Sequence, residues 1–140
     1  MKTANEMYEY IVKNKLGNGY AKRAYLKHFK LIEDALIGDE EVIYCFMGLE
    51  DLVVNHAYAV TSSGTLLAVR KKLFKYRMDL VPIKDIKSIE KDKGKGYGII
   101  IIDTNYDRKV IGVIQNESIK VYKSLKEIIE NMQSIEEGVI

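Results

Sequence analysis

The sequence of 140 residues has one cysteine, one proline and no tryptophan. With Cys45 alone, no intramolecular disulfide can form, which fits a reducing compartment. The opening stretch MKTANEMYEY lacks the apolar core of a signal peptide. The longest apolar runs, such as GIIII at 98–102, are far too short to span a bilayer. We therefore expect a soluble, cytoplasmic protein.

Groups that carry catalysis or bind metals are equally scarce. Cys45, His28 and His56 are the only soft ligands, whereas a structural zinc site needs four. Cys45 lies in an apolar strand pattern and His28 on an apolar helical stripe, where such side chains are inert parts of a core. The sequence predicts no enzyme, no metal and no cofactor, and an enzyme built on Cys45 ranks third among the hypotheses. Four aspartates fall near strand ends, where they suit local hydrogen bonds rather than acid–base pairs: Asp79, Asp85, Asp103 and Asp107.

The net charge of +2 is too small to indicate a partner, but it is unevenly spread. Residues 1–32 hold 7 bases and 2 acids, and residues 33–54 hold 7 acids and no base. Residues 64–98 hold 10 bases and 4 acids. Blocks of opposite sign indicate attraction within the fold, head-to-tail contacts between copies, or simply solvated faces.

Hydrophobic residues at helical spacing predict two helices before the main body, one ending at the GNG of 17–19 and one ending near Gly38. We assign residues 1–37 to this helical hairpin, as an extension of the same domain. Three roles are open for this hairpin: it caps the main body, it covers a sheet edge, or it reaches another subunit. The outer side of the second helix carries Lys22, Arg23, Lys27 and Lys30.

From residue 41 the hydrophobic residues recur with a period of two, which predicts seven antiparallel strands. The fourth is the clearest half-buried strand, with Phe74, Tyr76, Met78 and Leu80 alternating against Lys75, Arg77 and Asp79. The predicted strands cover residues 41–48, 56–62, 65–71, 74–81, 83–91, 97–104 and 108–115.

A last helix follows, with Asn116 as a plausible N-cap and an apolar stripe that reaches Met132. Its buried face is expected across the open end of the sheet. The fold class is therefore α+β. A small antiparallel barrel or sandwich of about seven strands is capped by a C-terminal helix and occupies residues 38–132, with a fraying tail at 133–140.

This plan resembles a pleckstrin-homology-like (PH-like) domain. The segments HAYAVTSSGTLLAVRK, VPIKDIKSIEKDKG and GIIIID, followed by the last helix, are similar to the bacterial PH-like family of the YokE type. The resemblance covers about residues 38–132 and implies a non-enzymatic binding or assembly module, since some bacterial domains of this kind self-associate. Relatives that bind phosphoinositides use bases between the first two strands. Here that loop, GLEDLVVN at 48–55, has Glu50 and Asp51 and no base.

The stretch VRKKLFKYR at 69–77 is the candidate contact site for a partner or an anionic surface. It connects the third and fourth strands, with an apolar pair at the tip of a basic turn. Such a tip docks on an anionic membrane, or its charges only prevent edge-to-edge aggregation. The candidate residues are Arg70, Lys71, Lys72, Leu73, Phe74 and Lys75.

The leading hypothesis is a binding module that works through protein contacts, including self-association into a homo-oligomer held by the acidic block 33–51 and the basic block 70–95. Membrane binding through residues 70–75 is the alternative. Nucleic acid is disfavoured by the small net charge, and KGKGYG at 93–98 precedes a strand rather than the helix of a phosphate loop, so it predicts a hairpin with glycines at positive φ. Tyrosines that would offer stacking platforms for nucleic acid are Tyr58, Tyr76, Tyr97 and Tyr106.

Overall fold

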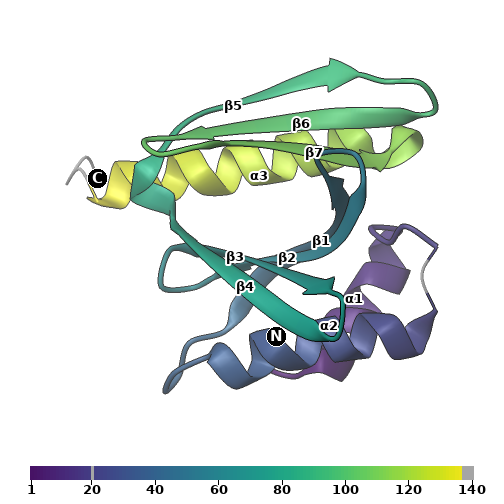
Figure 1. Cartoon of the computed structure of the whole chain (residues 1–140). Coiled ribbons are helices and arrows are strands. Elements are labelled where there is room, and N and C mark those ends of the chain that lie inside the picture. Colours follow the sequence, from purple (N-terminus) through teal and green to yellow (C-terminus); the bar gives the residue numbers. More distant parts are fainter. Residues whose placement is uncertain (20, 137–140) are drawn as a thin grey trace.

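A computed structural model describes residues 1–19 and 21–136, apart from the side chains of residues 115, 116 and 136 (Figure 1). It begins with the predicted helical hairpin, α1 (Ala4–Asn14) and α2 (Lys22–Ala35). A capping box between Thr3 and Glu6 starts α1. The helix ends before the predicted glycines, because Lys15 already adopts the left-handed conformation at φ 57°.

The described residues form one antiparallel sheet of seven strands in the order β4-β3-β2-β1-β7-β6-β5. All seven predicted strands are present with bounds shifted by a few residues. The largest difference is at residues 83–85, which form a 3₁₀ turn, η1 (Ile83–Asp85), before the fifth strand. The strands are β1 (Val42–Glu50), β2 (Val54–Thr61), β3 (Thr65–Lys72), β4 (Lys75–Pro82), β5 (Ile86–Lys93), β6 (Tyr97–Thr104) and β7 (Arg108–Ile114).

The sheet bends but does not close into a barrel. β1 pairs with β2 along its length, yet it pairs with β7 only through Leu49 and Glu50. Within the described chain β4 and β5 are the two outer strands. The strands therefore form one bent, open sheet rather than a closed barrel, and the predicted α+β arrangement of N-terminal helices, seven antiparallel strands and a C-terminal helix is confirmed.

The C-terminal helix α3 (Gln115–Glu136) packs on η1, β5, β6 and β7 through buried Val121, Leu125 and Ile129. This confirms the predicted amphipathic helix. It begins one residue before Asn116, whose predicted capping side chain lies outside the described residues. The tail predicted to fray lies partly outside them as well, since the description ends at residue 136.

Helices α1 and α2 lie against β1, β2 and β3, while α3 lies along the other part of the sheet (Figure 1). Where β1 leaves β7, its edge is covered by the flanks of α1, because the Met47 N–H donates to Leu16 O at 2.9 Å and the Val42 N–H to Met1 O at 2.7 Å. The helical hairpin therefore covers a sheet edge and a sheet face.

The side chains of β4 depart from the prediction. Tyr76 and Met78 are half-buried against the core, but Leu80 and Phe74 are exposed. Val81, on the opposite face, is buried instead. Tyr76 packs edge-on against His28 of α2, whereas Leu80 lies at the other end of this outer strand and is 62% exposed.

Candidate functional site

The turn between β3 and β4 places two large apolar side chains in solvent. β3 ends at Lys72 and β4 begins at Lys75, so Leu73 and Phe74 alone form the turn. Leu73 is 84% exposed and Phe74 is 95% exposed. The predicted apolar tip is therefore present, and neither side chain contributes to the core.

Leu73 also has an unfavourable backbone. Its φ is 58°, in the left-handed region. A leucine there costs on the order of 1 kcal/mol or more relative to glycine, the residue such turns ordinarily use. Neither the backbone conformation nor the exposure of Leu73 contributes to the stability of the folded chain.

Three cations flank this tip. Lys71, Lys72 and Lys75 are exposed, and none forms an ion pair with another described residue. Lys72 lies directly opposite Lys75 in the ladder. Like charges opposite each other oppose folding, so the turn concentrates positive charge at some cost in stability.

Arg70 does not join them. Strand alternation places it on the same face as Lys72 and Lys75 and opposite Lys71, but it lies deeper in the ladder, where it pairs in register with His56 and Arg77. Its Nε is buried without a hydrogen-bond partner among the described residues. Of the six residues predicted for the contact site, the structure brings five together at the tip and sends Arg70 inward.

A pocket of about 670 Å³ lies beside this tip, between the start of α2, the β1–β2 turn and the β3–β4 turn. Sequence reasoning missed it, because nothing in the sequence places α2 next to either turn. The one available signal was the basic outer side of α2. We call it the α2–hairpin pocket; it is lined by Ala21, Arg23, Ala24, Lys27, His28, Val53, Val54, Asn55, Lys71, Leu73 and Tyr76.

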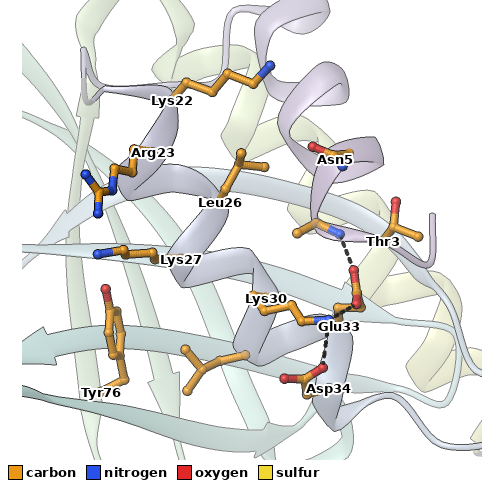
Figure 2. Close-up of a pocket in the computed structure, with 12 residues that line it drawn as sticks. Thr3, Asn5, Lys22, Arg23, Leu26, Lys27, Lys30, Glu33, Asp34 and Tyr76 are labelled. Carbon is orange, nitrogen blue, oxygen red and sulfur yellow. Dashed lines mark hydrogen bonds and ion pairs between the residues drawn. The ribbon is translucent and has the colours of Figure 1, made fainter.

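Figure 2 shows an adjoining pocket of about 980 Å³ beside α1 and α2, which shares Arg23, Lys27 and Tyr76 with the α2–hairpin pocket. Leu26 and Leu31 line it, together with cations. Part of the charge is compensated here, since Lys30 Nζ pairs with Glu33 and, at 3.2 Å, with Asp34 Oδ1. The pocket is also lined by Lys22, Arg23 and Lys27.

Cys45 does not have the properties of a nucleophile. It is buried in β1 with its Sγ 3.8 Å from Met7 O. Burial raises the pKa of the thiol to about 12, so the thiolate is not formed at neutral pH. His28 packs edge-on against Tyr76, while His56 stacks on Tyr58, both as core residues. No cluster of three or more metal-ligating side chains occurs in the described part of the chain.

The KGKGYG segment connects β5 to β6, as predicted. Only Gly96 has a positive φ, of 77°. Gly98 is needed for a different reason, because a Cβ there would overlap Ser118 of α3. The expectation that all its glycines need positive φ is therefore wrong. The four tyrosines weighed for base stacking are scattered, since Tyr58 is buried in the core and Tyr106 lies exposed on the β6–β7 turn.

The acidic block is largely engaged within the chain. Glu33 accepts a hydrogen bond from the Ala4 N–H at 2.7 Å, and Glu40 accepts from Ser63. Glu50 lies inside the sandwich beside Lys109 and Tyr58. Its negative charge is reduced where carboxylates pair with lysines, Glu33 and Asp34 with Lys30 and Glu50 with Lys109.

A search of protein-family models and of curated proteins finds no match to this chain. No helix in the described ranges is long and apolar enough to cross a membrane.

Proposed function

We propose that this chain is a non-enzymatic, cytoplasmic PH-like module that docks reversibly on anionic membrane surfaces through its apolar tip. We define the apolar tip as Leu73, Phe74 and Val53 of the neighbouring β1–β2 turn. Val53 is 76% exposed and lines the same pocket as Leu73. The observation that carries the proposal is the exposed leucine held at positive φ among unpaired lysines.

The energetics suit reversible docking. A Lys near an anionic surface contributes about 1 kcal/mol, so Lys71, Lys72 and Lys75 together contribute about 3 kcal/mol at low salt. Inserting Leu73 and Phe74 removes two large apolar side chains from water, each worth about 1.5–3 kcal/mol when fully buried. Two weak signals of different kinds are what stable peripheral binding needs.

Co-sedimentation with vesicles tests the proposal. Vesicles of phosphatidylcholine alone are compared with vesicles that also contain phosphatidylglycerol, at low and moderate salt. We expect binding to the anionic vesicles only. Changing Lys71, Lys72 and Lys75 to Gln should weaken it by more than about a hundredfold.

The matched control changes three exposed lysines far from the tip, Lys84, Lys87 and Lys123, to Gln as well. This variant should keep most of the binding. If the native protein does not co-sediment with anionic vesicles, or if both triple variants lose binding equally, the proposal of membrane docking through the apolar tip is wrong.

Self-association is the second candidate, and one observation favours it. The outer strands β4 and β5 leave both edges of the sheet open, and Leu80 on β4 is exposed. Open edges pair with other chains unless charge prevents it. A size in solution that grows with concentration and shrinks with salt would support it, whereas a monomer at high concentration and low salt would exclude it. The kinship with the YokE-type family remains part of the proposal.

A further inference from the structure

Of the two outer strands of the described sheet, β4 has the edge better suited to pair with another strand. It lies at one end of the strand order, next to β3 (Figure 1). At the other end, β5 carries charged residues at every position from 90 to 93, so charge lies on both of its faces and opposes strand pairing. On β4 the charged side chains lie on one face and the apolar ones on the other.

The free backbone groups of β4 follow from the turn that precedes it. A two-residue turn is closed by hydrogen bonds between the residues that flank it. Alternation along the ladder then directs the N–H and C=O groups of Tyr76, Met78 and Leu80 away from β3. Outside the ladders, no backbone hydrogen bond of the described chain uses these groups. Pro82 agrees with this alternation, because it takes the next outward position and has no N–H to donate to β3.

The apolar face of this edge is only partly covered. Tyr76 and Met78 are half-buried, whereas Leu80 is 62% exposed. The order Tyr-x-Met-x-Leu places one residue on each side of Met78 on this face. A second copy of the strand, running in the opposite direction, would therefore cover Leu80 with its Tyr76.

On the other face, Arg77 lacks a counter-charge. It lies directly opposite Arg70 in the ladder and forms no ion pair with another described residue. Like charges opposite each other destabilise a sheet. Asp79 places Oδ2 3.7 Å from Lys109 Nζ, but its side chain is 54% exposed, so the carboxylate has room for a second cation.

We infer that the β4 edge pairs with the β4 edge of a second copy, in an antiparallel homodimer whose two-fold axis passes between the two Met78 residues. Tyr76 then lies opposite Leu80 of the second copy. These pairs and the Met78 pair are hydrogen-bonded, so the outward N–H and C=O groups of both chains are satisfied. Arg77 lies opposite Asp79 of the second copy, twice by symmetry, at the non-hydrogen-bonded positions where side chains approach most closely.

This inference rests on the second candidate function, self-association, and gives it an interface of defined register. The contact is symmetric, unlike a head-to-tail attraction between charge blocks, so it stops at two copies. The antiparallel pairing puts the two apolar tips at opposite ends of the joined strands, so the dimer does not depend on membrane docking. Because the paired edges are short, we expect weak and reversible association.

Sedimentation equilibrium of the native protein without vesicles, over a range of concentrations, is the first experiment. We expect monomer and dimer with no larger species, because each chain has one β4 edge. Species that grow without limit would indicate head-to-tail contacts and overturn the two-fold interface. A strict monomer would overturn the inference together with self-association, and would leave the edge free for a strand of another protein. Neither result would affect membrane docking.

Exchange of the two charges tests the register. Arg77→Asp puts like charges opposite each other in both symmetry-related pairs, and Asp79→Arg does so with the opposite sign. Each variant alone should dimerise roughly tenfold more weakly, or worse. A mixture of the two should form a heterodimer of native affinity, because every reversed charge then meets its opposite. Lys87→Asp, on the β5 edge, is the matched control and should leave dimerisation unchanged.

Met78→Pro is a second test that leaves the contact between Asp79 and Lys109 intact. It removes only an outward N–H, so the fold should persist in urea unfolding while the dimer is lost. If Arg77→Asp and Met78→Pro both dimerise like the native protein, self-association stands but the β4 interface is wrong. If the two charge variants fold and their mixture does not dimerise, the register about Met78 is wrong.

Discussion

Lys109 on β7 places its Nζ 3.5 Å from Oε1 of Glu50 on β1, although 59 residues separate them in the chain. Both side chains are almost inaccessible to water, at 6% and 12% exposure. The same Nζ lies 3.7 Å from Asp79 Oδ2 on β4. Lys109 therefore links strands from both parts of the bent sheet on the side where no ladder closes it.

Removing this lysine should lower the free energy of unfolding. Lys109→Ala leaves Glu50 buried without its cation, and breaking a buried pair in this way costs about 3–5 kcal/mol. Urea unfolding measures the loss as a lower transition midpoint. Replacing both partners, in Lys109→Met with Glu50→Leu, should recover much of it, because no charge is then left unpaired. A loss below about 1 kcal/mol in the single variant would show that the pair does not matter for stability.

A substitution in the apolar tip should stabilise the folded chain, whereas the loss of Lys109 destabilises it. Leu73→Gly relieves the positive φ and should raise the free energy of unfolding by about 1 kcal/mol, less the entropy that glycine adds to the unfolded chain. The same change should weaken binding to anionic vesicles, since it deletes half of the inserted apolar pair. Chemical unfolding and co-sedimentation on one sample give both numbers. Leu80→Thr, on the exposed end of β4, is the control that should leave vesicle binding unchanged. A Leu73→Gly protein that binds as well as the native one would contradict the role of the tip.

The sequence predicted the strands and the turn between them for a local reason. The apolar run over residues 97–104 and the alternation over residues 74–81 are set by neighbours in the chain, and a short turn follows once two strands are placed. Leu73 and Phe74 were therefore placed correctly at the tip.

Relations between distant segments were beyond the sequence. The Glu50–Lys109 pair and the approach of Arg23 to Lys71 depend on how the sheet bends and on which face α2 covers. Arg70 was misplaced for a local reason. The expectation grouped the cations by their nearness to the turn, whereas strand alternation already turns Arg70 to the opposite face from Lys71.

Close packing at Gly98 gives a further test. Gly98→Ala would push its Cβ into Ser118 and displace α3 from β6, an overpacking that costs about 1–3 kcal/mol. Ser118→Gly in the same protein removes the obstacle, so the double variant should lose less than the sum of the single changes. A double-mutant cycle by urea unfolding measures that coupling. Strictly additive losses would mean that the two residues do not meet.

His28 makes stability depend on pH in a predictable direction. Burial lowers its pKa below the usual value of 6.5, so around and below that pH the unfolded chain binds more protons than the folded one. The contribution of His28 is therefore present above about pH 6.5 and is lost as the pH falls toward the folded pKa.

His28→Phe keeps a ring against Tyr76 without the proton. We expect the unfolding free energy of the native protein to fall more steeply between about pH 7.5 and pH 5.5 than that of the variant. Urea unfolding of both proteins across this range measures the difference, in which the other titrating groups cancel. Parallel curves would show that the pKa of His28 is the same in the folded protein as in the unfolded chain.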